Sequence, residues 1–130
     1  MKIGPASTAS GVSRRMIRHY EGIRLIGAAP RRSSGYRDYS DSDVHRLQFI
    51  ANARDLGFPI DDIRALLELW SDSSRSSADV KMLATARAEE FGRKAHALEA
   101  MRHTLLDLAA RCDGDESPAC PIIAALERRD

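Results

Sequence analysis

The sequence predicts a mainly α-helical fold: short helices and a hairpin, then one long helix, a loop and a short terminal helix. Three observations predict it. Helix caps and turn residues recur in the first 76 residues, residues 79–110 contain no proline, and two cysteines flank a turn-rich loop near the C-terminus. We therefore expect three parts, at residues 1–76, 77–110 and 111–130.

The composition is typical of a globular chain and excludes several classes. Hydrophobic residues make up 43% and charged residues 30% of the 130 residues. No apolar run approaches the roughly 20 residues that span a bilayer, and the N-terminus lacks the apolar centre of a secretion signal. Two cysteines do not suit a disulfide-stapled secreted fold. We expect a cytoplasmic protein with reduced thiols and no membrane partner.

Positive charge is concentrated in the N-terminal part. The formal net charge is only +1, but residues 1–54 hold ten basic and four acidic side chains, and residues 55–130 hold ten basic and fifteen acidic ones. Nine of the ten N-terminal cations are arginine, which suits bidentate contacts with phosphate or guanine edges. A solvated basic face is the alternative to a surface that binds phosphate or guanine. The local structure around these arginines distinguishes the two interpretations.

Two short helices joined by a glycine turn open the chain. Gly11 ends the first helix, and Ser13 is placed to cap the second. The second helix has an apolar side formed by Met16, Ile17 and Tyr20. Its arginines project elsewhere: Arg14, Arg15 and Arg18. This pattern indicates a helix-turn-helix, whose second helix enters a DNA major groove.

Residues 31–39 predict a hairpin, called the wing below, because turn residues at 33–35 separate two extended pieces. Its arginines and Tyr36 would flank a groove, with a plain surface turn as the alternative, and we expect Tyr39 in the core. Two further helices follow, one capped by Ser40 and ended by Gly57, the next started at Pro59. Their expected apolar positions are Val44, Leu47, Phe49 or Ile50, Ala51, Ile63, Leu66, Leu67 and Trp70.

A long helix is predicted after the serine-rich linker at 71–77. A heptad frame gives one seam position at Ala84, Phe91, Leu98 and Leu105, and the other at Arg87, Lys94, Met101 and Leu108. Six of these eight residues are apolar, and a projecting helix of this length cannot bury the stripe alone. The simplest partner is a second copy of the chain in a homodimer; packing back on its own domain is the alternative.

Cys112 and Cys120 lie on either side of a loop that contains Gly114 and Pro118, so their sulfurs can meet. Two thiolates favour soft ions such as Cu(I), or zinc, over hard cations. Structural zinc normally takes four Cys or His ligands, and no local histidine completes such a set, which favours an ion that accepts linear coordination, such as Cu(I), Ag(I) or Au(I). Buried free thiols and a redox-switched disulfide remain alternatives.

Together these residues resemble the MerR family of transcription activators, and within it the copper-efflux regulators, over essentially the whole chain. The resemblance rests on Gly11-Val12-Ser13, Ile17-Arg18-His19-Tyr20-Glu21, Ser34-Gly35-Tyr36-Arg37-Asp38-Tyr39, Ala53-Arg54-Asp55-Leu56-Gly57-Phe58, Ser76-Ser77-Ala78-Asp79-Val80-Lys81 and Cys112-x7-Cys120-Pro121-Ile122-Ile123. It implies a winged helix-turn-helix, an antiparallel coiled coil of long dimerisation helices and a metal-binding loop with a short C-terminal helix.

The resemblance also implies residue roles. It puts Arg18, Tyr20, Tyr36 and Arg37 at the DNA and adds phosphate contacts from Arg14, Arg15, Arg31 and Arg54. It makes Cys112 and Cys120 the ligands of one Cu(I), Ag(I) or Au(I) ion. Ser77 stands where divalent-metal relatives have a cysteine, and Lys81 offsets the charge of two thiolates. The family usually has glycine at the position of Arg24, and we expect Gly22 to supply that turn instead.

The predicted function is a dimeric, metal-responsive activator that binds a palindromic promoter in double-stranded DNA. It would activate copper-efflux genes by distorting that DNA, and so reach RNA polymerase only indirectly. A thiol-redox regulator that uses the same cysteines is the alternative, and a metal carrier without DNA binding is a third hypothesis. An enzyme is not expected, because the sequence has no glycine-rich phosphate loop, paired acid and base or open zinc site.

Overall fold

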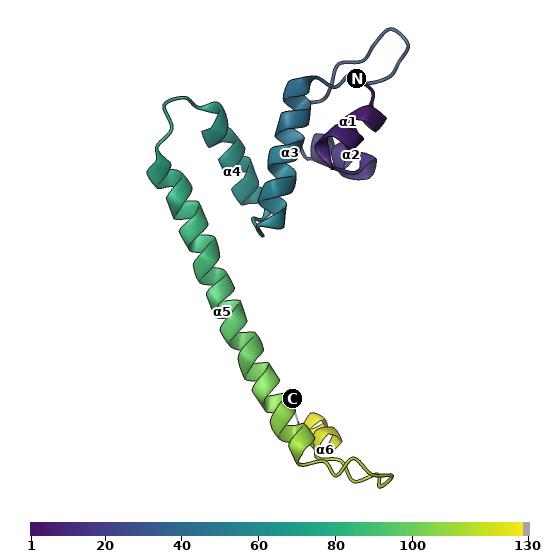
Figure 1. The fold of residues 1–130 in the computed structure, drawn as a ribbon, viewed down its shortest axis with the longest axis vertical. Helices are drawn as coiled ribbons and strands as arrows, with labels where there is room; N and C mark the ends of the chain where they lie inside the picture. The colour runs from purple at the N-terminus through teal and green to yellow at the C-terminus, as the bar shows by residue number, and fades with distance from the viewer. Residues whose placement is uncertain (129–130) are drawn as a thin grey trace. The chain divides into compact units, whose positions relative to one another are not determined.

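The computed structural model describes residues 1–128, and its regular elements are helices (Figure 1). They are α1 (Ile3–Ser10), α2 (Arg14–Gly22), α3 (Asp41–Asp55), α4 (Ile60–Ser71), α5 (Ser77–Ala110) and α6 (Pro121–Glu127). The predicted mainly helical class is confirmed. Within residues 1–128 no strand forms, and the wing's two extended pieces meet in one isolated antiparallel bridge, between Arg31 and Arg37. None of the described helices combines the length and apolar character needed to cross a membrane.

The turn between α1 and α2 is built as the sequence predicts. Gly11 has a φ of 76°, and its N–H donates to the carbonyl oxygen of Ser7 at 2.9 Å. Glycine adopts this left-handed conformation without steric cost. The Oγ of Ser13 accepts a hydrogen bond from the N–H of Met16 at 3.2 Å and so caps α2. Both predicted helix boundaries are confirmed.

The end of α2 corrects one expectation. Gly22 stays inside the helix, and Arg24 takes the left-handed conformation with a φ of 59°. The N–H of Arg24 donates to the carbonyl of Glu21 at 3.1 Å, and the N–H of Leu25 donates to that of Tyr20 at 2.9 Å. These are the two bonds of a Schellman motif. The motif places its left-handed residue two positions after the helix, so Gly22 cannot supply the turn.

α3 and α4 are also delimited by residues visible in the sequence. Ser40 and Asp43 form a reciprocal capping box: the Ser40 Oγ accepts from the Asp43 N–H at 3.1 Å, and Asp43 Oδ2 accepts from the Ser40 N–H at 2.9 Å. Gly57, with a φ of 90°, follows the end of α3, and Pro59 is the N-cap of α4. The predicted start and end signals are therefore confirmed.

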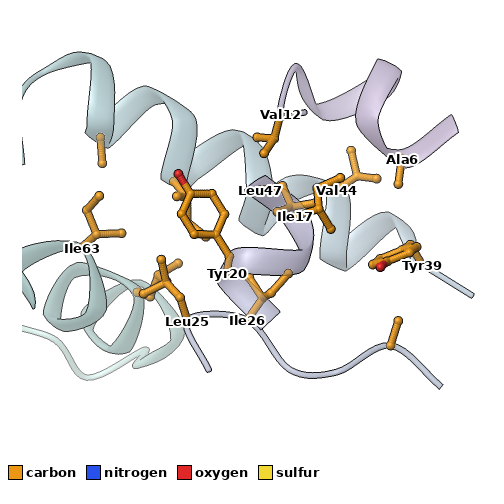
Figure 2. Packing of buried hydrophobic residues seen from close by; sticks show 14 residues of the cluster. Ala6, Val12, Ile17, Tyr20, Leu25, Ile26, Tyr39, Val44, Leu47 and Ile63 are labelled. Carbon is orange, nitrogen blue, oxygen red and sulfur yellow. The ribbon is translucent and has the colours of Figure 1, made fainter. Parts of the chain in front are cut away.

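A single hydrophobic core joins the first four helices and the wing (Figure 2). α1 packs against α2 and α3, and α3 packs against α4. Tyr39, only 2% exposed, belongs to this core as predicted. Trp70 does not: it is 41% exposed and stacks on Phe49 with ring centroids 4.5 Å apart. Trp70 is the last residue of the predicted apolar face of α4, and it lies in the last turn of that helix, where the core ends.

The chain divides into two compact units, Met1–Ala84 and Thr85–Asp130. The first contains the core, and the second contains most of α5, the cysteine loop and α6. α5 is one helix of 34 residues, as the absence of proline predicts. Its apolar seam is uncovered: Leu98 is 63% and Leu105 60% exposed. The division into parts at 1–76, 77–110 and 111–130 stays a prediction.

Candidate nucleic-acid interface and cysteine pair

α2 presents its arginines to solvent because its other side is anchored in the core. Ile17 is fully buried, which fixes the rotation of the helix about its axis. The three predicted arginines of this helix, Arg14, Arg15 and Arg18, are all exposed. The helix therefore carries an unobstructed basic surface of the kind that binds phosphate.

The wing is closed tightly enough to hold its side chains in place. The N–H of Arg32 donates to the carbonyl of Tyr36, and the N–H of Gly35 donates to the carbonyl of Arg32, each at 2.8 Å. Gly35 has a φ of 90°, which favours glycine at this turn. Arg31 Nη1 also donates to the carbonyl of Gly35 at 2.9 Å. These bonds order the wing although only one bridge pairs its two sides.

The structure brings α2 and the wing together around a shared hollow. Arg18 from α2 and Arg31, Tyr36 and Arg37 from the wing all line it. Arg18, Arg31 and Arg37 also line an adjacent hollow. Four of the predicted DNA-contact residues thus converge from two elements. Arg54, exposed in the last turn of α3, lines neither hollow.

Lys2 belongs to the same hollow, and sequence reasoning missed it. Its Nζ lies 4.7 Å from the centre of the Tyr36 ring, a cation–π contact. The only signal available in the sequence was a lone lysine near the start of a basic segment. Its proximity to the wing is a tertiary contact that no local pattern predicts.

A buried carboxylate links α2 to the wing. Glu21, whose side chain is 5% exposed, forms an ion pair with Arg37 and accepts a hydrogen bond from the hydroxyl of Tyr39. Burial raises the pKa of Tyr39, so the phenol stays protonated and able to donate. A buried charge is costly unless it is paired, and Arg37 provides that pairing. Arg37 is therefore held in position by α2 itself.

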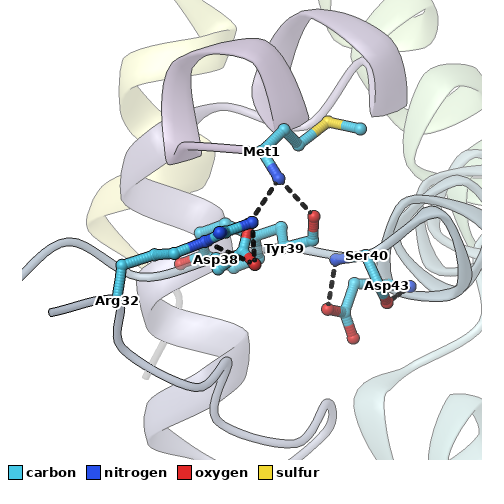
Figure 3. A network of polar contacts seen from close by, with 6 residues as sticks. All are labelled: Met1, Arg32, Asp38, Tyr39, Ser40 and Asp43. Atoms are coloured by element: carbon cyan, nitrogen blue, oxygen red, sulfur yellow. Dashed lines mark hydrogen bonds and ion pairs between the residues drawn. The ribbon is translucent and has the colours of Figure 1, made fainter.

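A second polar cluster ties the wing to the start of the chain (Figure 3). The amino group of Met1 donates to Asp38 Oδ1 and to the carbonyl of Tyr39, both at 2.7 Å. Arg32 contacts the other carboxylate oxygen, with its Nε at 3.0 Å and its Nη2 at 2.9 Å. The hydrogen bond from the amino group lowers the pKa of Asp38, and Arg32 acts in the same direction.

Tyr20 is the predicted DNA-contact residue that the structure buries. Its side chain is 5% exposed and packs in the core, as Figure 2 shows. The same helical face that buries Ile17 also buries Tyr20, since the two residues are three positions apart. Tyr20 therefore supports α2 from the core side and is not part of the exposed arginine surface.

The two cysteines come together in the second unit. Cys120 is the N-cap residue of α6, and Cys112 follows the end of α5. Both are free thiols and half-buried. A hydrogen bond from the backbone N–H of Ile123 lowers the pKa of Cys120, and bonds from the N–H of Ile122 and the side chain of Cys112 act in the same direction. Hydrogen bonds to the charged form favour the thiolate, which is the form that binds metal.

The donor set suits a soft ion with few ligands. Across residues 1–128, no group of three or more His, Cys, Asp or Glu side chains is placed to hold a metal. Two sulfurs without a third ligand fit a monovalent ion in linear coordination and do not make a tetrahedral zinc site. Ser77 and Lys81, both exposed, belong to the first unit. The structure therefore does not unite these two residues with the cysteines in one unit.

Comparisons with known proteins extend over most of the chain. A family model described as "MerR HTH family regulatory protein" matches residues 1–70, and one described as "MerR, DNA binding" matches residues 44–108. Heavy metal-dependent transcription regulator 2 of Rhizobium meliloti (strain 1021) is 53% identical over 123 residues, which cover 95% of this chain and 84% of the relative.

Two further comparisons agree with these. The transcriptional regulator CueR of Escherichia coli O157:H7 is 36% identical over 126 residues, which cover 97% of this chain and 93% of the relative. The crystal structure of the transcription regulator PbrR691 from Ralstonia metallidurans CH34, in complex with lead(II), matches with a TM-score of 0.86 at 28% identity. That match covers 97% of this chain and 98% of the solved chain.

Proposed function

The chain belongs to the MerR family of transcription regulators, and from this premise we propose that it is a dimeric activator that responds to a monovalent metal ion. The relatives are regulators and not enzymes. One of them is named for dependence on heavy metals, and the solved relative contains lead(II). The observation that carries the proposal is the pair Cys112 and Cys120, whose side chains are hydrogen bonded in a site with no third ligand among the described residues.

Promoter DNA is the proposed partner of the arginine surface. Arg18, Arg31, Tyr36 and Arg37 converge on one hollow. Arg14 and Arg15 are exposed on the same helix as Arg18, and Arg54 is exposed on α3. We propose that α2 enters the major groove and that the wing binds the adjacent phosphates. A palindromic site follows if two copies bind together, because a two-fold dimer matches a two-fold operator. Such a protein acts in the cytoplasm, where the promoters are.

Two copies would pair through α5. Its apolar seam is exposed, and an antiparallel pair would set the start of one helix beside the end of the other. Ser77 and Lys81 of one subunit would then approach the cysteine pair of its partner. A serine at this place adds no third sulfur, and a lysine would balance the net negative charge of two thiolates holding a monovalent cation.

Cu(I) is the proposed ion, with Ag(I) and Au(I) as ions of the same charge and geometry. A bound ion would supply a covalent link between the two sulfurs. Cys112 and Cys120 would then fix the loop between α5 and α6. Because metal can shift the DNA-bound protein only if it favours one conformation, we propose that this conformation distorts the promoter so that RNA polymerase engages it.

A thiol switch is the alternative function of the same residues. The contact between the two free thiols and the lowered pKa of Cys120 favour it, since a thiolate is the reactive form in disulfide exchange. In that case oxidant would replace metal as the inducer, and a disulfide between Cys112 and Cys120 would form.

Transcription from the chain's own promoter tests the proposal. The reduced protein is titrated anaerobically with Cu(I), Ag(I), Zn(II) and Hg(II). Cys112→Ser should abolish induction by Cu(I) and leave operator affinity within about twofold, because the cysteines lie outside the DNA-binding surface. Glu116→Gln, at an exposed side chain of the same loop, should change neither. Induction by Cu(I) that survives Cys112→Ser would end the metal hypothesis. Induction only by oxidant would favour the thiol switch.

A substitution at Arg18 tests the proposed DNA binding by α2. Arg18→Ala should weaken operator binding by about 1–3 kcal/mol if the guanidinium reads a base. A gel shift across several salt concentrations measures this loss. An affinity equal to that of the wild-type protein at every salt concentration would remove Arg18 from the interface.

A further inference from the structure

The connector that leaves α2 is held from across the fold. α2 ends at Gly22, and Arg24 carries the chain through a left-handed turn toward the wing. Arg64 of α4 reaches this turn with both ends of its guanidinium: Nη2 donates to the carbonyl of Ile23 and Nη1 donates to the carbonyl of Arg24, each at 3.0 Å. One side chain therefore bridges two consecutive carbonyls some forty residues away in the sequence.

These bonds meet a specific need of the turn. Carbonyls at a helix C-terminus lack partners within the helix, and positive charge is favourable there. A non-glycine residue in the left-handed region is strained, and at this position the chain has arginine where glycine would be free of strain. The planar guanidinium presents two parallel donors in a fixed geometry. The two hydrogen bonds from Arg64 thus stabilise a left-handed turn that a glycine would adopt without strain.

We propose that Arg64 is a positioning residue for DNA recognition. It fixes the direction in which the chain leaves α2, and hence the placement of the wing against that helix. Arg18 lies before the connector and Arg31 and Arg37 lie after it, and all three line the same hollow. A connector that relaxes would let Arg31 shift away from Arg18 without removing any contact residue, while Arg37 keeps its own ion pair with Glu21 of α2. This inference rests on the proposed DNA binding.

The fold offers a matched control. Arg46 of α3 lines the same hollow as Arg64 and Arg24. Its Nη2 bonds to the Oγ of Ser71 at 3.2 Å, and it makes no described bond to the connector. Arg46→Gln and Arg64→Gln therefore remove the same charge from the same region, but only the second releases the turn. Any difference between them reports the two hydrogen bonds and not the loss of positive charge.

The experiment measures affinity for operator DNA and for a scrambled duplex of equal length. Arg64→Gln should weaken operator binding about tenfold, because DNA binding must then order the connector without the two charged hydrogen bonds, at a cost of about one decade of affinity. It should change binding to the scrambled duplex no more than Arg46→Gln does. The operator affinity of Arg64→Lys should lie between those of the wild-type protein and Arg64→Gln, because an ammonium keeps the charge but not the paired donors. All proteins are compared at a temperature where circular dichroism shows them folded.

A glycine at position 24 should rescue the variant. Arg24→Gly lets the turn keep its left-handed conformation without the two hydrogen bonds from Arg64. In the Arg24→Gly background, the effect of Arg64→Gln on operator affinity should therefore shrink from tenfold to less than about twofold. A residue that merely stabilised the fold would show the same loss in both backgrounds.

The outcomes separate this inference from the function it rests on. Failure of the wild-type protein to prefer operator over scrambled DNA would overturn the proposed function. Wild-type preference combined with equal effects of Arg64→Gln and Arg46→Gln would overturn the role of Arg64 alone, as would the absence of rescue. Should Arg64→Gln fail to fold, the same comparison is made with Arg64→Lys against Arg46→Lys, with and without Arg24→Gly.

Discussion

The carboxylate of Asp38 contacts two positively charged groups. The amino group of Met1 and the guanidinium of Arg32 both contact it, so the ionised form is favoured in the folded protein and the pKa is lowered. A carboxyl whose pKa is lower in the folded state contributes stability above its unfolded pKa and loses it as pH falls through its folded pKa. The attachment of the wing to the start of the chain should therefore weaken in acid.

This predicts a pH dependence that one substitution removes. Asp38→Asn should lower the melting temperature at pH 6, and the gap from the wild-type protein should narrow as the pH falls from 6 through the lowered pKa of Asp38, because the wild-type carboxylate is then being protonated as well. Thermal unfolding followed by circular dichroism at several pH values measures the gap. Asp55→Asn, an exposed carboxylate outside the wing, serves as control. A gap that stays constant over this range would contradict the prediction.

Single residues also mark the limit of what the sequence could predict. Gly11, Ser13, Ser40 and Gly57 signal local geometry, and the sequence predicts their roles because each effect depends only on neighbours in the chain. Arg24 could not be interpreted this way, since nothing local requires an arginine to turn left-handed. Its conformation is stabilised by Arg64, a partner that only the tertiary structure supplies.

At the scale of elements, α2 and the wing are coupled through Glu21 and Arg37. The pair is asymmetric, since the Glu21 side chain is 5% exposed and the Arg37 side chain 36%. Removing one member leaves a buried polar group without its partner, which costs more than removing both. The two elements should therefore behave as one energetic unit.

A double-mutant cycle tests this coupling. Glu21→Gln and Arg37→Gln should each lower the free energy of unfolding by about 1–3 kcal/mol, and the double variant should lose at least about 1 kcal/mol less than the sum. Urea unfolding of the four proteins gives the coupling energy. The exposed pair Glu99 and Arg102 on α5 provides the comparison, with an expected coupling below about 0.5 kcal/mol. Equal coupling energies for the two pairs would refute the link.

The elements themselves were largely predictable, and their contacts were not. Helical periodicity identified the faces that bury Val44, Leu47 and Ile63, because the 3.6-residue repeat is a local property. It could not tell how far the core extends along a helix, and Trp70, on the predicted apolar face of α4, lies at the edge of the core. It also could not separate a tyrosine buried beneath α2, such as Tyr20, from one that lines the hollow beside the wing, such as Tyr36, since an aromatic ring with a hydroxyl suits either place.

At the scale of the whole molecule, the exposed seam of α5 is the feature that needs a partner. Large apolar residues along it, Phe91, Leu98, Met101 and Leu105, are at least 41% exposed. Contiguous apolar surface of this kind marks association sites. Charges introduced into the seam should keep each unit folded and prevent two chains from pairing.

With the proposed pairing through α5, the wild-type chain should sediment as a dimer and the double variant Leu98→Glu/Leu105→Glu as a monomer. Operator affinity should fall by well over tenfold, because one half-site is then bound without the effective concentration that the second provides. Ala100→Glu, which adds a charge to the same helix off the seam, should leave both properties unchanged. A double variant that remains dimeric would place the dimer contact elsewhere.

Trp70 gives the molecule a built-in optical reporter. It is the chain's single tryptophan, and its ring is stacked on Phe49 at an interplanar angle of 7° while one part faces solvent. Ultraviolet emission from the protein therefore originates chiefly at the contact between α3 and α4, in the unit that carries the arginines of α2 and the wing. A change in that emission when an ion is added to the cysteines would be a direct, label-free record of a signal crossing from one unit to the other.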